Sequence, residues 1–154
     1  MRKLILELIT ATALTLAAIL TTVADARAND VIVSEAFARA SATPTAETGV
    51  IYVTIANTGS VADQLTGVAT DAAQMAHLHN SEMKDGVASM TPVASLAIAP
   101  GETVVMKPGG LHIMLMGLKA PLKKGGHIGL DLTFAKAGTI HADVPVGGVG
   151  AMTP

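Results

Sequence analysis

Residues 111–116 read Leu-His-Ile-Met-Leu-Met, an alternation of branched aliphatic side chains with histidine and methionine. In a β-strand, successive side chains point to opposite faces of the sheet. The alternation therefore predicts a strand that turns one face to the core, formed by Leu111, Ile113 and Leu115. The opposite face then carries a row of soft metal ligands, formed by His112, Met114 and Met116. Taken alone, the segment is also compatible with methionines that only fill gaps in a hydrophobic surface.

The rest of the chain consists of similar short segments rich in Val, Ile, Leu and Thr, separated by turns that contain Gly or Pro. No sustained 3.6-residue apolar period is present, so the pattern favours strands over helices. The strands that we expect are Val31–Arg39, Gly49–Asn57, Gln64–Ala69, Gln74–Met83, Val87–Val93, Thr103–Met106, Leu111–Leu118, Ile128–Phe134 and Thr139–Val146. Strands at this spacing predict one all-β domain over residues 29–146, a β-sandwich or Greek-key barrel. We expect the Gly-rich tail, residues 147–154, to be flexible.

The composition excludes several classes of function. The 154 residues include no Cys, which excludes disulfides, zinc ribbons, iron–sulfur clusters, thiol nucleophiles and the cysteine-ligated blue-copper site. Ten Lys and Arg residues against twelve Asp and Glu residues give no basic excess, so nucleic acid is not expected as a partner. The residues left for soft metal chemistry are eight Met and five His.

The N-terminus has the layout of a secretory signal peptide over residues 1–28. Two basic residues at positions 2 and 3 precede a mostly apolar stretch at 8–23, and small residues follow up to Ala28. We expect cleavage after Ala28, with Ala26 as the other A-x-A site. An uncleaved anchor is the alternative, but the apolar stretch is shorter than the ~20 residues needed to span a bilayer. The mature form is therefore expected to be exported and not embedded in a membrane.

A second segment brings another histidine and methionine together. Asp85-Gly86 is a strong signal for a two-residue hairpin turn. The resulting register sets Ser81 opposite Met90, so that His79 and Met90 become diagonal neighbours, about 7–8 Å apart at the backbone. Two imidazoles and two thioethers form a neutral, soft donor set that suits Cu(I), whereas Mg and Ca require oxygen ligands. The four candidate metal ligands are His79, Met90, His112 and Met114.

Three further residues lie on the same strands as these candidates. His77 shares the face of His79, and we expect it to be exposed, with an auxiliary or Cu(II) ligand as the alternative. Met116 is expected at the rim of the core or as a shield over the site. Met83 lies roughly 13 Å along the strand from His79, which is too far for both to bind the same ion.

The other histidines and methionines of the domain have no soft partner nearby in the sequence. Met75 and Met106 lie in apolar strand contexts, so we expect both to pack in the core. His127 follows two glycines and His141 lies in the last expected strand. We expect both histidines to be structural or exposed.

The order and spacing of the four candidate ligands resemble a known family. His79, ten residues, Met90, twenty-one residues and then His112-Ile113-Met114 match the H-x10-M-x21-H-x-M motif of the periplasmic copper chaperones of the PCu(A)C type. The similarity covers nearly all of residues 30–146. It implies a cupredoxin-like β-barrel that binds Cu(I) through His79, Met90, His112 and Met114, with no catalytic residues.

The resemblance also implies a function, that of a non-enzymatic, periplasmic copper carrier. Its recipient would be the copper A centre of cytochrome c oxidase, often reached alongside a thiol-bearing assembly factor, and we expect a monomer. Two alternatives remain. One is an exported β-sandwich that acts as an interaction or assembly module without metal, and the other is a copper redox enzyme, suggested by the His77-x-His79 pair.

Overall fold

The computed structural model describes residues 30–154, which form ten β-strands and no helix. The expected signal peptide, residues 1–28, lies outside the described residues. In the described part, no helix is long and apolar enough to cross a membrane. The strands are β1 (Val31–Arg39), β2 (Thr48–Asn57), β3 (Asp63–Ala69), β4 (Ala73–Lys84), β5 (Val87–Pro92), β6 (Leu96–Ile98), β7 (Thr103–Val105), β8 (Leu111–Leu118), β9 (His127–Phe134) and β10 (Gly138–Gly147).

The all-β prediction is confirmed, and each expected strand matches an observed strand to within one residue at both ends. The exception is β6, a three-residue strand that the sequence analysis did not predict. It pairs with β3, where Leu65 lies opposite Leu96. Three residues are too few to display a period-2 pattern, so the signal for this strand was absent from the local sequence.

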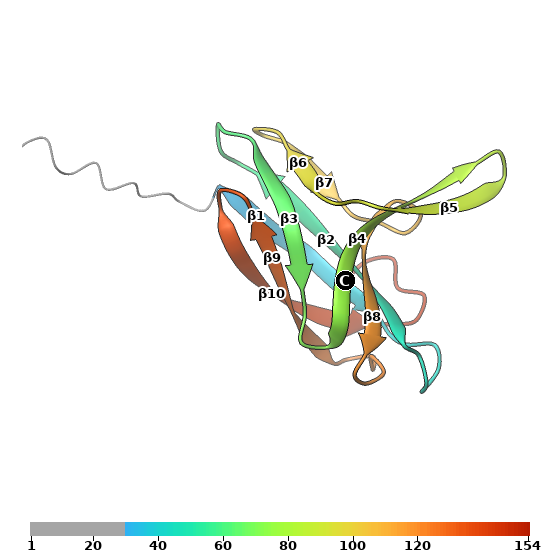
Figure 1. Cartoon of the computed structure of the whole chain (residues 1–154). Helices are drawn as coiled ribbons and strands as arrows, with labels where there is room; N and C mark the ends of the chain where they lie inside the picture. Colours follow the sequence, from blue (N-terminus) through green and yellow to red (C-terminus); the bar gives the residue numbers. More distant parts are fainter. Residues whose placement is uncertain (1–29) are drawn as a thin grey trace, which may run out of the picture.

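The strands form a single sheet in the order β5-β4-β8-β2-β1-β10-β9-β3-β6, with β7 paired to β2 (Figure 1). The two ends of this path do not pair, so the sheet is not a closed barrel. Its two halves join only where β1 runs parallel to β10, at Ala38↔Val146 and Arg39↔Gly147. One buried cluster draws on both halves, with Ile51 and Ile113 from one and Leu130 and Leu132 from the other. The halves therefore enclose a common core.

Strand β8 has the two faces that its alternation predicted. Ile113 and Leu115 are fully buried in the core, and Leu111 packs against its edge. His112 lies on the opposite face but is also buried, because Tyr52 on the neighbouring strand β2 covers it, with ring centroids 6.5 Å apart. The rows of core and ligand side chains are thus separated by the thickness of the sheet.

The β4–β5 hairpin extends away from the rest of the sheet (Figure 1). Its register is the expected one, with Ser81 opposite Met90 and His79 opposite Pro92. Both turn residues have a left-handed backbone conformation, with φ of 52° at Asp85 and 78° at Gly86. A two-residue hairpin turn of type I′ requires a positive φ at both positions. The turn chemistry therefore fixes which residues of β5 face those of β4.

Candidate metal centre

The two histidines of the candidate site come from adjacent strands. Strands β4 and β8 are antiparallel neighbours, and their register sets His79 directly opposite His112. The two imidazole rings lie edge to face, with centroids 6.0 Å apart and an interplanar angle of 78°. Residues that face each other across a strand pair have Cβ atoms about 4.5–5.5 Å apart. The sheet thus brings both rings to one place on its outer face.

Both candidate thioethers lie on the same face as the histidines. Met114 is two residues from His112 along β8 and opposite His77 on β4. Met90 belongs to β5 and lies opposite Ser81 of β4, so it is the diagonal neighbour of His79. Diagonal neighbours are within reach of long side chains. The four predicted ligands therefore converge on one patch, formed by three strands.

The imidazoles have ring nitrogens available for a ligand. His112 Nδ1 lies 3.0 Å from the carbonyl oxygen of Gly110. Because a carbonyl only accepts, Nδ1 carries a proton, and in the neutral ring Nε2 then has the free lone pair. His79 Nδ1 is buried and has no hydrogen-bond partner. A buried polar atom without a partner costs about 1–3 kcal/mol of stability. A metal ion bound at His79 Nδ1 would remove part of that cost.

Among the described residues, no Asp or Glu side chain lines the hollow at the candidate site, whereas the Arg39 cation does. Burial lowers the pKa of His79, and repulsion from the His112 and His77 imidazolium forms lowers it further. Burial raises the pKa of the Tyr52 phenol, against the opposing effect of the Arg39 cation. The neighbouring side chains therefore add no negative charge that would favour a hard divalent cation.

An open hollow leads to this patch. It has a volume of about 360 Å³, and its lining includes Arg39, Tyr52, Met90, His112 and Met114. Met90 contributes a side chain that is 53% exposed, whereas His112 is 6% exposed. The donor set therefore has a protected end on β8 and an accessible end on the hairpin.

Arg39 borders the hollow and is a residue that the sequence analysis did not connect with the site. Its guanidinium lies over the Tyr52 ring, 5.6 Å from the centroid, and Tyr52 also packs on Phe37. Arg39 Nε donates to the Ala151 carbonyl at 2.8 Å, and Nη2 lies 3.1 Å from Met152 Sδ. These contacts link the last residues of the chain to the border of the hollow, while the predicted flexibility of residues 147–154 stays a prediction.

The remaining methionines divide between core and surface. Met106 is 3% exposed, so the prediction that it packs in the core is confirmed. The same prediction is wrong for Met75, which is 50% exposed. Met75 occupies the outer face of β4 directly opposite Met116, and its apolar sequence context did not reveal which face it would take. Met83 is 72% exposed near the tip of the hairpin.

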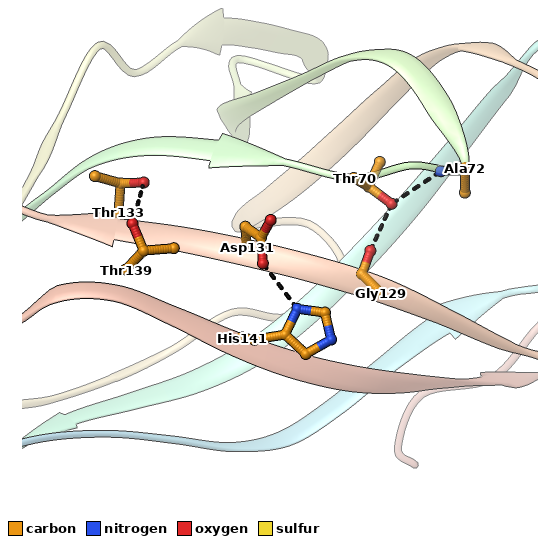
Figure 2. A network of polar contacts seen from close by, with 7 residues as sticks. All are labelled: Thr70, Ala72, Gly129, Asp131, Thr133, Thr139 and His141. Atoms are coloured by element: carbon orange, nitrogen blue, oxygen red, sulfur yellow. Dashed lines mark hydrogen bonds and ion pairs between the residues drawn. The ribbon is translucent and has the colours of Figure 1, made fainter.

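The other two histidines lie on the β9–β10 pair and each has a carboxylate partner. His141 Nδ1 lies 2.8 Å from Asp131 Oδ1 (Figure 2), and His127 Nδ1 lies 2.7 Å from Asp143 Oδ2. Both side chains are exposed, as predicted. Within residues 30–154, no group of three or more His, Cys, Asp or Glu side chains could hold a metal ion.

Known proteins resemble this chain in sequence. The family model described as putative lipoprotein LpqE-like matches residues 31–146. A putative lipoprotein of Leifsonia xyli subsp. xyli is 41% identical over 93 residues, which cover 60% of this chain and 56% of the relative. The match thus spans little more than half the length of that curated relative.

Solved structures resemble the fold. The copper-bound PCuAC domain from PmoF2 is 21% identical, with a TM-score of 0.65 over 77% of this chain and 93% of that domain. The solution structure of Cu(I)-DR1885 from Deinococcus radiodurans is 30% identical, with a TM-score of 0.60 over 79% of this chain and 83% of that protein. These likenesses confirm the cupredoxin-like fold that the spacing motif implied. The chain therefore belongs to the LpqE-like family, and its fold is that of the PCuAC-type domains.

Proposed function

We propose that this protein is a copper chaperone that binds Cu(I) through His79, Met90, His112 and Met114. The observation that carries the proposal is the β4–β8 register, which sets His79 opposite His112 with Met114 on the same face. Met90 joins them from the hairpin. The solved structures described as copper-bound PCuAC and Cu(I)-DR1885 support copper as the ligand.

The donor set suits a carrier of Cu(I). Thioether sulfur and imidazole nitrogen are neutral ligands of the kind that Cu(I) prefers. Neither ligand type can be lost to disulfide formation, which threatens thiolates in an oxidising compartment. The exposed Met90 at the hairpin provides a ligand that an incoming donor group can replace. These properties favour holding and release of the ion over chemistry on a substrate.

We propose further that the protein works in the periplasm, as a monomer, and delivers copper to the copper A centre of cytochrome c oxidase. A thiol-bearing assembly factor would act beside it. Support for export comes from the signal-like N-terminus and from the lipoprotein descriptions of the family and its relative. The recipient follows from the PCu(A)C resemblance.

Competition with a chromophoric Cu(I) chelator under anaerobic conditions tests the binding site. We expect one tight Cu(I) equivalent, and Met114→Leu should weaken it by at least about 100-fold, because loss of a ligand exceeds the 10–100-fold typical of an outer hydrogen-bond partner. Met106→Leu is the matched control, since it makes the same substitution in the core, and it should leave the affinity unchanged. Equal affinities for all three proteins would contradict the ligand assignment, and a wild type that fails to compete for Cu(I) would favour a metal-free interaction module.

Transfer tests the delivery step. The Cu(I)-loaded protein is mixed with an apo copper A domain, and the metal content of each is measured after separation. We expect copper to move to the copper A domain. A thiol reductant or a thiol-bearing partner is present to keep the cysteines of the copper A domain reduced. Retention of copper by the loaded protein under these conditions would exclude this recipient while leaving the binding site intact.

A further inference from the structure

The row of soft side chains does not end at the candidate centre. One step beyond the His77↔Met114 pair, Met75 on β4 lies directly opposite Met116 on β8. Because side chains on one face of a strand recur every two residues, Met75, His77 and Met116 share the outer face with the four proposed ligands. The sheet therefore presents a second group of two thioethers and one imidazole.

Two of these three side chains, Met75 and His77, lie outside the core. Met75 is half exposed and His77 is exposed, while Met116 is partly buried beside them. A methionine usually fills irregular gaps in a core, as Met106 does here. Met75, by contrast, has half of its surface exposed to solvent. Its position opposite a second thioether is therefore the feature that needs an explanation.

The spacing permits one ion to contact all three residues. Met75 and Met116 face each other with Cβ atoms about 4.5–5.5 Å apart, and His77 follows Met75 by roughly 6.8 Å along the strand. The thioether arms have three rotatable bonds each and can turn towards a common centre. On the other side of Met116, β2 contributes Thr48, so the pairs that flank Met116 bring no charged side chain.

We propose that Met75, His77 and Met116 form a second binding site for a soft monovalent cation such as Cu(I) or Ag(I). This site has three donors and greater exposure, so it binds more weakly than the four-donor site beside it. His77 lies opposite Met114, so the two sites adjoin along the β4–β8 pair. The proposal concerns residues outside the four-ligand site, and the order of filling that it states rests on the proposed function.

Titration with Ag(I), a redox-stable substitute for Cu(I), tests the second site. The signals of the methionine methyl groups are followed by NMR, and the bound equivalents are counted by native mass spectrometry. We expect two equivalents, with the Met75 and Met116 methyl signals moving during the second. The double variant Met75→Leu/Met116→Leu should keep the first equivalent and lose the second.

Met83→Leu is the matched control, because it changes an exposed methionine on the same face of β4, near the hairpin tip, and it should keep both equivalents. Binding of a single equivalent by the wild type, or of two by the double variant, would overturn the proposal. Movement of the Met75 and Met116 signals with the first equivalent would also overturn it, since these residues would then belong to one shared site. Met114→Leu separates a failure of the four-ligand site from a failure of the second site. If this variant binds the first equivalent as tightly as the wild type does, the four-ligand assignment is wrong, and the assignment of the second site is unaffected.

Discussion

Two faces of this molecule carry histidines on antiparallel strands, and their partners differ. On the β4–β8 pair, His79 faces His112, and thioethers lie on either side. On the β9–β10 pair, His127 and His141 each contact an aspartate at 2.7 and 2.8 Å. Strands β9 and β10 contain no Met, so neither imidazole has a thioether neighbour on its own strand pair. The comparison teaches that the neighbours across the strand pair, more than the histidine itself, decide whether a soft ion can be bound.

The largest expected difference in Cu(I) affinity is between two variants, each of which lacks one histidine from one of the two faces. His112→Ala should weaken Cu(I) binding by at least about 100-fold, because it removes a buried ligand whose Nε2 is free, a loss greater than the 10–100-fold typical of an outer hydrogen-bond partner. His141→Ala should change the affinity by less than about twofold, since its partner is Asp131 on the other half of the sheet and the change lies far from any thioether pair. Chelator competition on both variants measures the difference. Equal losses would break the comparison between the two faces.

Acid should produce the next largest effect. Imidazole must be neutral to bind a metal, and protonation of one ordinary histidine of pKa about 6.5 weakens binding roughly tenfold between pH 7.5 and 5.5. The pKa of His79 lies below its usual range, so His79 stays neutral to lower pH and contributes less to this loss. We therefore expect the Cu(I) affinity to fall as the pH falls, with the contribution of His79 confined to the acid end of this interval.

Chelator competition repeated across this pH range provides the measurement, with the chelator's own protonation corrected separately. The variant Met106→Leu should follow the wild-type curve, because the substituted residue lies in the core. An affinity that stays constant from pH 8 to 5 would argue against histidine ligation.

The smallest effect is expected from the aspartate partner of His141. Asp131→Asn removes the carboxylate from an exposed contact with His141, and even exposed ion pairs contribute only about 0–1 kcal/mol to stability. We expect the free energy of unfolding to change by less than about 0.5 kcal/mol and the Cu(I) affinity to stay the same. Urea unfolding of the apo protein measures the first quantity and chelator competition the second. A large loss of copper binding would mean that the β9–β10 face takes part in the site.

Local sequence was sufficient for most of the strands and for one half of the site. The Leu-His-Ile-Met-Leu-Met alternation predicted both faces of β8, and Asp85-Gly86 predicted the pairing of Ser81 with Met90. Both signals act over a few residues, because side-chain direction alternates along one strand and a two-residue turn fixes the register of its hairpin. The three-residue strand β6 and the outward position of Met75 had no comparable local signal.

The sequence by itself therefore determined the all-β class, nine of the ten strands to within one residue at each end, the spacing motif and the neutral, cysteine-free donor set. Only the tertiary structure decided that β4 pairs with β8, which brings His79 opposite His112 and Met75 opposite Met116. It also decided that β9 and β10 give His127 and His141 their aspartate partners. The reason is physical: pairing between strands far apart in the chain is selected by how the whole sheet buries its common core, and no short segment contains that information.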